Sequence, residues 1–77
     1  MNKWLNWENN KNKLKDGDLI LVEFGIKEPI HEYQSFIVKQ QNNNLFLRYS
    51  NFDININEVN KPYSIQILRF LYMKDIL

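Results

Sequence analysis

Residues 35–49 read SFIVKQQNNNLFLRY, and this stretch of the 77-residue chain decides the fold. Two segments rich in branched and aromatic side chains flank a run of asparagines, which tolerate the positive φ of a tight turn. With residues 42–43 as a two-residue turn, Val38 lies opposite Leu47. A slip of one residue would mix the side chains of the two faces, so the pattern predicts a β-hairpin with this register.

The two faces of this hairpin differ in composition. One face is expected to carry Phe36, Val38, Leu45, Leu47 and Tyr49. The other face is expected to carry Ile37, Lys39, Phe46 and Arg48. If the second face is open, it presents an aromatic anchor beside positive charge, a composition favoured at interface centres. If another layer covers it, Phe46 is a core residue, and the sequence leaves both readings open.

Other segments predict further strands. Residues 19–24 (LILVEF) form a short apolar run between glycines, which is typical of a central strand. Residues 52–59 begin with strict alternation of apolar and polar side chains, which predicts a half-buried strand. Residues 25–34 contain a glycine, a proline and several charges, and predict a loop.

The segment 63–72 fits two structures. Ile65, Leu68 and Tyr72 follow a helical stripe, whereas the β-branched and aromatic content favours a strand. We favour the strand, and residues 73–77 then form a tail that turns helical. Such a strand is expected to place Tyr63, Ile65, Ile67 and Leu71 on one face.

These elements predict a mainly β fold, either a small antiparallel sheet or an SH3-like barrel of four to five strands, in a single domain over residues 1–77. Trp4 and Trp7 are three residues apart, so a short helical turn at the N-terminus would put both on one side, as a lid on the core. The expected aromatic core is Phe24, Phe36, Tyr49, Phe52 and Phe70. Trp4, Trp7 and Phe46 are then the aromatics left for contact with a partner.

The composition argues against catalysis and metal binding. The chain has eleven aromatic residues, no Cys and one His, so it offers no disulfide and no thiolate or multi-histidine metal site. His31 stands beside Glu32, and neighbours on a strand point to opposite faces, which favours an exposed loop histidine. Asp16 and Asp18 flank Gly17 and predict a turn rather than a catalytic carboxylate pair. We expect no enzyme activity, no cofactor and no metal.

Charge and hydropathy set further expectations. Residues 1–15 hold four Lys against one Glu, and residues 16–32 hold five acidic residues against one Lys. Such blocks indicate solvated loops or a polarised docking surface. No apolar run approaches the length of a membrane span, and the N-terminus has no signal-peptide core. With the lack of Cys, this favours a cytoplasmic protein without membrane contact.

Binding of single-stranded nucleic acid is the alternative function. Trp4, Trp7, Phe46 and Tyr49 offer rings for stacking bases, as in other small β-barrels. Phosphate contacts would fall to Lys3, Lys11, Lys13, Lys15, Lys39 and Arg48. The acidic segment 16–32 and the presence of only two arginines weigh against this function.

The N-terminal third carries a family resemblance. Residues 4–7 (WLNW) followed by residues 14–24 (LKDGDLILVEF) resemble small phage-encoded accessory proteins, which begin with Trp-rich polar segments that lead into a first strand. The resemblance implies a compact inhibitor or adaptor that occupies the surface of a host protein, such as a defence nuclease. It carries no functional residues over to this chain.

Together, these observations predict a non-catalytic binding protein that acts through protein–protein contacts, as an inhibitor of a host defence protein. The expected partner-binding residues are Trp4, Trp7, Ile37, Lys39, Phe46 and Arg48. A free strand edge also offers a route to a homodimer, or to strand addition by a partner.

Overall fold

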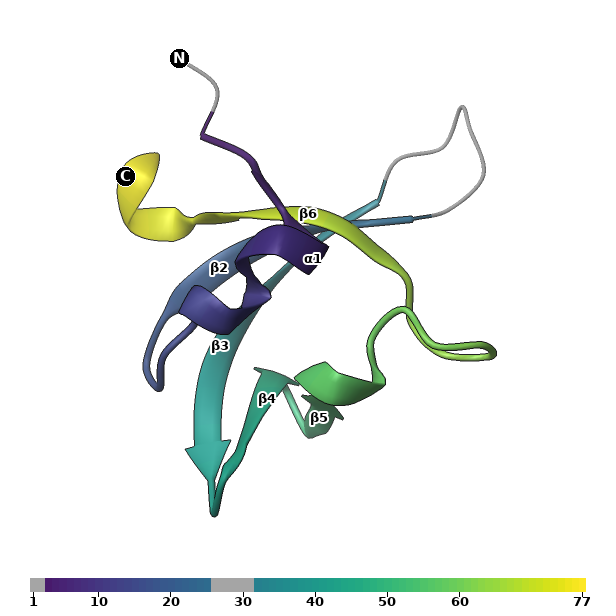
Figure 1. Ribbon diagram of the computed structural model, residues 1–77. Coiled ribbons are helices and arrows are strands. Elements are labelled where there is room, and N and C mark those ends of the chain that lie inside the picture. Colours follow the sequence, from purple (N-terminus) through teal and green to yellow (C-terminus); the bar gives the residue numbers. More distant parts are fainter. Residues whose placement is uncertain (1–2, 26–31) are drawn as a thin grey trace.

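The computed structural model describes residues 3–25 and 32–77, which are mainly β-sheet (Figure 1). Their strands are β1 (Leu5–Asn6), β2 (Leu19–Phe24), β3 (Tyr33–Gln41), β4 (Asn44–Tyr49), β5 (Phe52–Asn55) and β6 (Ile67–Tyr72). The helical segments are α1 (Trp7–Asn10) and three 3-10 turns, η1 (Lys11–Lys13), η2 (Ile56–Glu58) and η3 (Met73–Asp75). The predicted fold class and short N-terminal helix are confirmed, with one strand more than the four to five expected.

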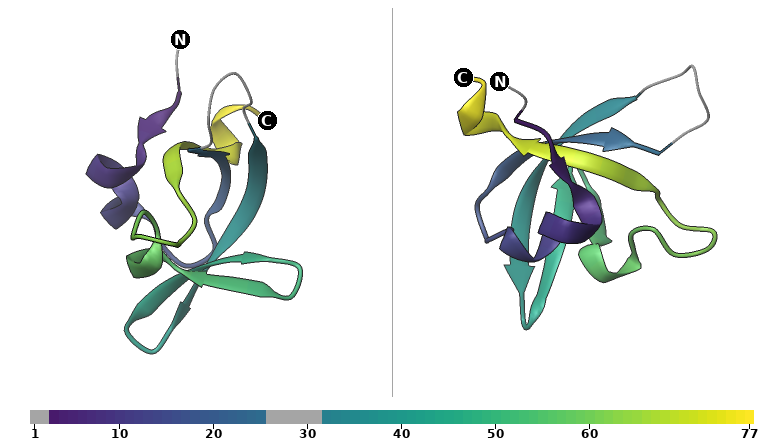
Figure 2. Two further views of the ribbon diagram at one scale, coloured as in Figure 1. Left: turned by 90° about the vertical axis from the view of Figure 1, so that its right-hand side faces the viewer. Right: turned by 45° about the horizontal axis from the view of Figure 1, so that its top comes forward.

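All strand pairs are antiparallel, and the strands form one sheet with the order β1-β6-β2-β3-β4-β5. The last strand, β6, returns to lie between β1 and β2, so the two ends of the described chain meet in the sheet. The sheet curls, with α1 and η2 on one side and β3 on the opposite side of the molecule (Figure 2). The edges of the sheet are the two-residue β1 and the four-residue β5.

The β3–β4 hairpin has the predicted register. Val38 pairs with Leu47, and both side chains are fully buried. The turn between the strands begins at Asn42, which has a φ of 58°. Asn accepts this conformation more readily than most residues, because its short polar side chain bonds locally. A second two-residue turn follows, in which Ser50 has a φ of 54° and Tyr49 pairs with Phe52.

Three strand boundaries differ from the prediction. β5 stops at Asn55, because the Asn55 side chain accepts a hydrogen bond of 2.9 Å from the Asn57 N–H and starts η2. β3 already begins at Tyr33, inside the predicted loop. β6 begins only at Ile67, because a turn precedes it in which the Lys61 N–H donates to the Ser64 hydroxyl oxygen at 2.9 Å. The predicted helical tail is present as η3.

A β-bulge in β6 changes the predicted face of one side chain. Glu23 pairs with Arg69, but Phe24 pairs with Ile67, so Leu68 is an extra residue without a partner on β2. A bulge reverses the alternation of side chains on either side of it. Ile67 is therefore buried in the core, and the expected single face with Tyr63, Ile65 and Leu71 is wrong.

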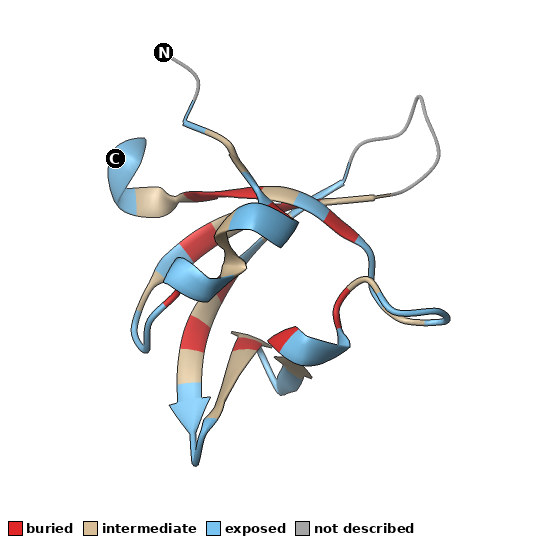
Figure 3. Ribbon diagram, viewed as in Figure 1, coloured by how far each residue is buried: buried red, intermediate tan, exposed pale blue. Residues whose placement is uncertain are grey.

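One face of the curled sheet, here called the inner face, carries the core. Figure 3 marks the buried residues along the ribbon. The cluster of buried side chains is Trp7, Leu14, Ile20, Val22, Phe36, Val38, Leu47, Ile56, Val59, Ile67 and Phe70. Side chains from α1 and η2 close it, and the Trp7 ring meets the Phe70 ring edge-on at 5.7 Å. The opposite side of the sheet is called the outer face below.

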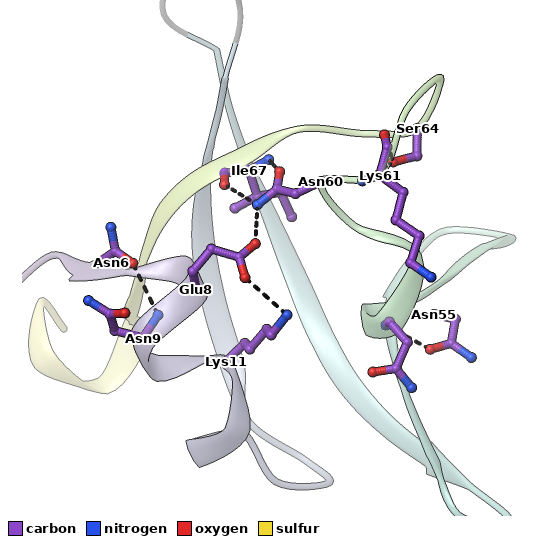
Figure 4. Close-up of polar contacts among 10 residues, drawn as sticks. Asn6, Glu8, Asn9, Lys11, Asn55, Asn60, Lys61, Ser64 and Ile67 are labelled. Carbon is purple, nitrogen blue, oxygen red and sulfur yellow. Dashed lines mark hydrogen bonds and ion pairs between the residues drawn. The ribbon is translucent and has the colours of Figure 1, made fainter.

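Asn60 joins α1 to β6 (Figure 4). Its side-chain oxygen accepts from the Ile67 N–H at 2.6 Å, and its side-chain NH₂ donates to the Ile67 carbonyl at 3.0 Å and to Glu8 at 2.8 Å. The amide thus satisfies the backbone at the start of β6 as a neighbouring strand would. Hydrogen bonds from Asn60 and from Lys11 lower the pKa of Glu8 below its ordinary value.

Candidate functional site

The outer face of the β3–β4 hairpin brings four of the six predicted site residues together. Ile37 pairs with Arg48, and Lys39 pairs with Phe46, so the four side chains occupy two neighbouring rows of the sheet. All four are half-buried. Among the described elements, β3 has its main contacts with its strand neighbours β2 and β4. Phe46 itself alternates with the buried Leu47 along β4 and is not part of the core cluster, so it lies on the sheet face opposite the core.

Arg48 on this face already has an ionic partner. Its Nε donates to Oδ1 of Asp53 at 2.7 Å, and its Nη2 donates to Oδ2 at 3.0 Å, a two-bond fork between β4 and β5. The hydrogen bonds from Arg48 lower the pKa of Asp53, and the same contact raises the pKa of Arg48. The guanidinium charge is therefore balanced within the protein. Lys39 is the remaining predicted cation beside Phe46.

The apolar part of this face extends onto β2. Leu19 pairs with Ile37 across β2 and β3, and its side chain is 52% exposed. Side chains alternate between the two faces along a strand, and Ile20 and Val22 are fully buried on the inner face. Leu21 therefore lies on the same outer side of β2 as Leu19. We call Leu19, Leu21, Ile37 and Phe46 the outer stripe.

The two tryptophans occupy different sides of the sheet. Residues 5–6 form strand β1, and α1 begins only at Trp7, so no helical turn spans both rings. Trp7 has no exposed surface and belongs to the core. The prediction that Trp7 contacts a partner is wrong, because its side chain is fully buried in the folded chain. The Trp7 indole N–H has no hydrogen-bond partner among the described residues.

Trp4 belongs to a cluster around a buried carboxylate on the outer face. Glu23, in the central strand β2, is only 2% exposed and forms an ion pair with Arg69. The Arg69 guanidinium carbon lies 4.6 Å from the centre of the Trp4 ring. The Tyr33 hydroxyl donates to Glu23 at 3.4 Å, and the Tyr33 ring lies 5.8 Å from that of Trp4. Trp4 and Arg69 thus cover Glu23.

The exposed aromatics also differ from the prediction. Phe24 and Phe36 pack edge-on at 6.3 Å, and Phe36 and Tyr49 do the same at 6.3 Å. However, Tyr49 is 50% exposed and Phe52 is 70% exposed, although both were expected in the core. Phe52 begins the edge strand β5, and Tyr49 is its partner across the preceding turn, so both lie at a corner of the sheet.

The remaining predictions concern acidic and titratable groups. Asp16 accepts from the Gln40 N–H at 2.7 Å, Asp18 accepts from the Lys15 N–H at 2.8 Å, and Gly17 has a φ of 92°, so the turn is confirmed. Among the described residues, no group of three or more potential ligands is placed to hold a metal ion. His31 lies outside the described residues. No helix in the described ranges has the length and apolar character needed to cross a membrane.

Comparisons with known proteins identify no family for this chain. No protein-family model matches the chain, and neither the curated proteins nor the solved structures contain a significant match.

Proposed function

We propose that this chain is a non-catalytic protein-binding protein that docks a partner on the outer stripe. The observation that carries the proposal is the position of Phe46 and Ile37, half-buried on a sheet face beside Lys39. An aromatic and a branched side chain on such a face supply apolar area at the centre of a contact. Lys39 and the Arg48–Asp53 pair supply a polar rim.

The charge arrangement favours a protein over a polyanion. Both arginines are held by carboxylates, Arg48 by Asp53 and Arg69 by Glu23, and Lys11 pairs with Glu8 at 3.1 Å. Affinity for nucleic acid depends mainly on cations that neutralise phosphates. Three of the cations are thus already neutralised within the fold. In the role we propose, the protein inhibits a host protein by covering its surface, as the resemblance to phage accessory proteins implies.

Affinity capture from the host tests this proposal. Tagged protein is used with and without nuclease treatment, and bound proteins are identified by mass spectrometry. We expect one partner that survives nuclease and binds Phe46→Ala about 30-fold more weakly, the loss typical of a central aromatic anchor. Tyr63→Ala is the matched control, because Tyr63 is a fully exposed aromatic outside the strands, and it should bind like wild type.

Two results would contradict the proposal. Equal capture by Phe46→Ala and wild type would remove the outer stripe from the interface. Binding of single-stranded DNA or RNA that weakens steeply with added salt would favour the alternative function. Circular dichroism of each variant shows whether the fold is kept, and an unfolded Phe46→Ala would place Phe46 among the residues that hold the sheet together.

A further inference from the structure

A mostly apolar cleft lies at one end of the sheet, between the turn at residues 16–18 and the 3-10 turn η3. Ile20 pairs with Tyr72 at this end of β2 and β6, so the residues that precede Ile20 lie close to those that follow Tyr72. The lining of the cleft includes Asp18, Leu19, Tyr72, Met73, Lys74 and Leu77. The cleft therefore joins the start of β2 to the C-terminal segment of the described chain.

The cleft begins where the outer stripe ends. Leu19 belongs to both, because it is 52% exposed on the outer face and also lines the cleft. It pairs with Ile37 on β3, which lies beside the β4 strand that carries Phe46. Neighbouring strands are about 4.8 Å apart, so about 10 Å separates β4 from the strand at the cleft. A partner seated on the outer stripe thus has the cleft within reach.

The size of the cleft fits a single side chain. Its volume is about 240 Å³. Sites for drug-sized ligands and cofactors typically measure about 300–1,000 Å³, which is larger. At protein interfaces, by contrast, much of the binding energy comes from single anchor side chains that fill small pockets. The cleft therefore suits an anchor residue of a partner better than a cofactor-sized ligand.

The charged groups at the cleft already have contacts within the protein. The Asp18 carboxylate accepts from the Lys15 N–H at 2.8 Å, and Nζ of Lys74 lies 5.3 Å from the centre of the Tyr72 ring. Burial, with the charges of Asp18 and Asp75, raises the pKa of Tyr72, so its hydroxyl is neutral at neutral pH. A charged group that leaves water without gaining a partner is strongly penalised. The cleft therefore favours an uncharged occupant.

We propose that the protein partner docked on the outer stripe inserts one aromatic side chain into this cleft. An aromatic ring is favoured over an aliphatic side chain, because rings pack edge-to-face on a tyrosine and against the thioether of a methionine, and Tyr72 and Met73 offer both. Leu19 and Leu77 add apolar wall. This inference rests on the proposed function, and it describes the partner as one with an exposed aromatic residue about 10 Å from its contact with Phe46.

N-acetyl-phenylalanine amide is the probe that tests the cleft, because it presents the side chain without a charge. Titration followed by ¹H–¹⁵N NMR should give saturable shifts at the amides of Leu19, Met73 and Leu77, with a Kd of about 1 mM for so small a ligand. N-acetyl-leucine amide should bind about threefold more weakly, because it lacks the aromatic contacts.

Two neighbouring variants provide a matched control for the probe. Leu77→Asp places a carboxylate on the wall of the cleft and should weaken binding of the phenylalanine amide by about tenfold or more. Ile76→Asp makes the same change next to it, at a residue that is not part of the cleft lining, and should bind like wild type. Both side chains are exposed, so both variants should keep the fold, which circular dichroism checks.

Three results with the probe would overturn the inference: no saturable shifts with the phenylalanine amide, equal or tighter binding of the leucine amide, or equal binding by Leu77→Asp and Ile76→Asp. The captured partner then separates this inference from the proposed function. If Phe46→Ala weakens capture but Leu77→Asp and Ile76→Asp capture equally, only the aromatic anchor is overturned. If Phe46→Ala captures like wild type, the proposed function and the inference fall together.

Discussion

Two arginine–carboxylate pairs lie on the same outer face of the sheet and differ in burial. Glu23 sits in the central strand with its side chain 3% exposed, and Arg69 covers it with a side chain that is 40% exposed. Arg48 and Asp53 sit near the edge, with side chains 42% and 38% exposed. The same type of ion pair thus occurs in a buried and in an exposed environment. The first pair links the neighbouring strands β2 and β6 and sets Arg69 against the Trp4 ring, whereas the second pair remains accessible beside the outer stripe.

Arg69→Met should have the largest effect, because it leaves a buried carboxylate without its cation. Removing one partner of a buried pair is strongly destabilising, and since Arg69 is partly exposed we expect about 3 kcal/mol, the low end of the observed range. The contact with the Trp4 ring is lost as well. Urea unfolding at neutral pH measures the change. Arg48→Met is the matched control, and an equal loss of stability in both variants would mean that burial does not separate the two pairs.

Glu23→Gln should cost less than Arg69→Met. The amide keeps the size of the side chain and still accepts from the Tyr33 hydroxyl, while the partly exposed Arg69 retains water and the Trp4 ring. We expect a loss of about 1–2 kcal/mol in unfolding free energy, the scale of one charged hydrogen bond. The asymmetry between the two variants is the informative quantity. A larger loss of unfolding free energy for Glu23→Gln than for Arg69→Met would mean that the arginine, rather than the carboxylate, is the costlier group to leave without its ionic partner.

The sequence predicts contacts between residues that are close along the chain better than contacts between residues that are far apart. The β3–β4 hairpin follows from a local pattern around one turn, and its register is confirmed. The Arg48–Asp53 pair spans five residues and follows from the next turn, once β5 is paired with β4. Glu23 and Arg69 are 46 residues apart, and only their positions inside apolar strands give a local hint of the ion pair.

The tryptophans show the same limit. Their spacing of three residues predicts a shared helical side, and a two-residue strand is too short to leave a sequence pattern. Pairing of Leu5 with Phe70 in β6 sets β1 in the sheet and places Trp4 and Trp7 on different sides. This pairing joins residues near the two ends of the chain, and no local periodicity in the sequence indicates it. The exposure of Phe52 likewise follows from the place of β5 in the strand order rather than from its own alternation.

Asp53→Asn should have the smallest effect, because the edge pair is exposed and salt screens it. We expect a small loss of stability at neutral pH that disappears in about 1 M NaCl. The pKa of Asp53 is lowered in the folded chain, so its stabilising contribution is present above the ordinary value of 3.8 and is lost as pH falls through the folded pKa. Wild type and Asp53→Asn should therefore converge in urea midpoint as pH decreases. A difference that persists in acid and in salt would show instead that the amide disturbs the packing of β5, and the edge pair would then resemble the buried one.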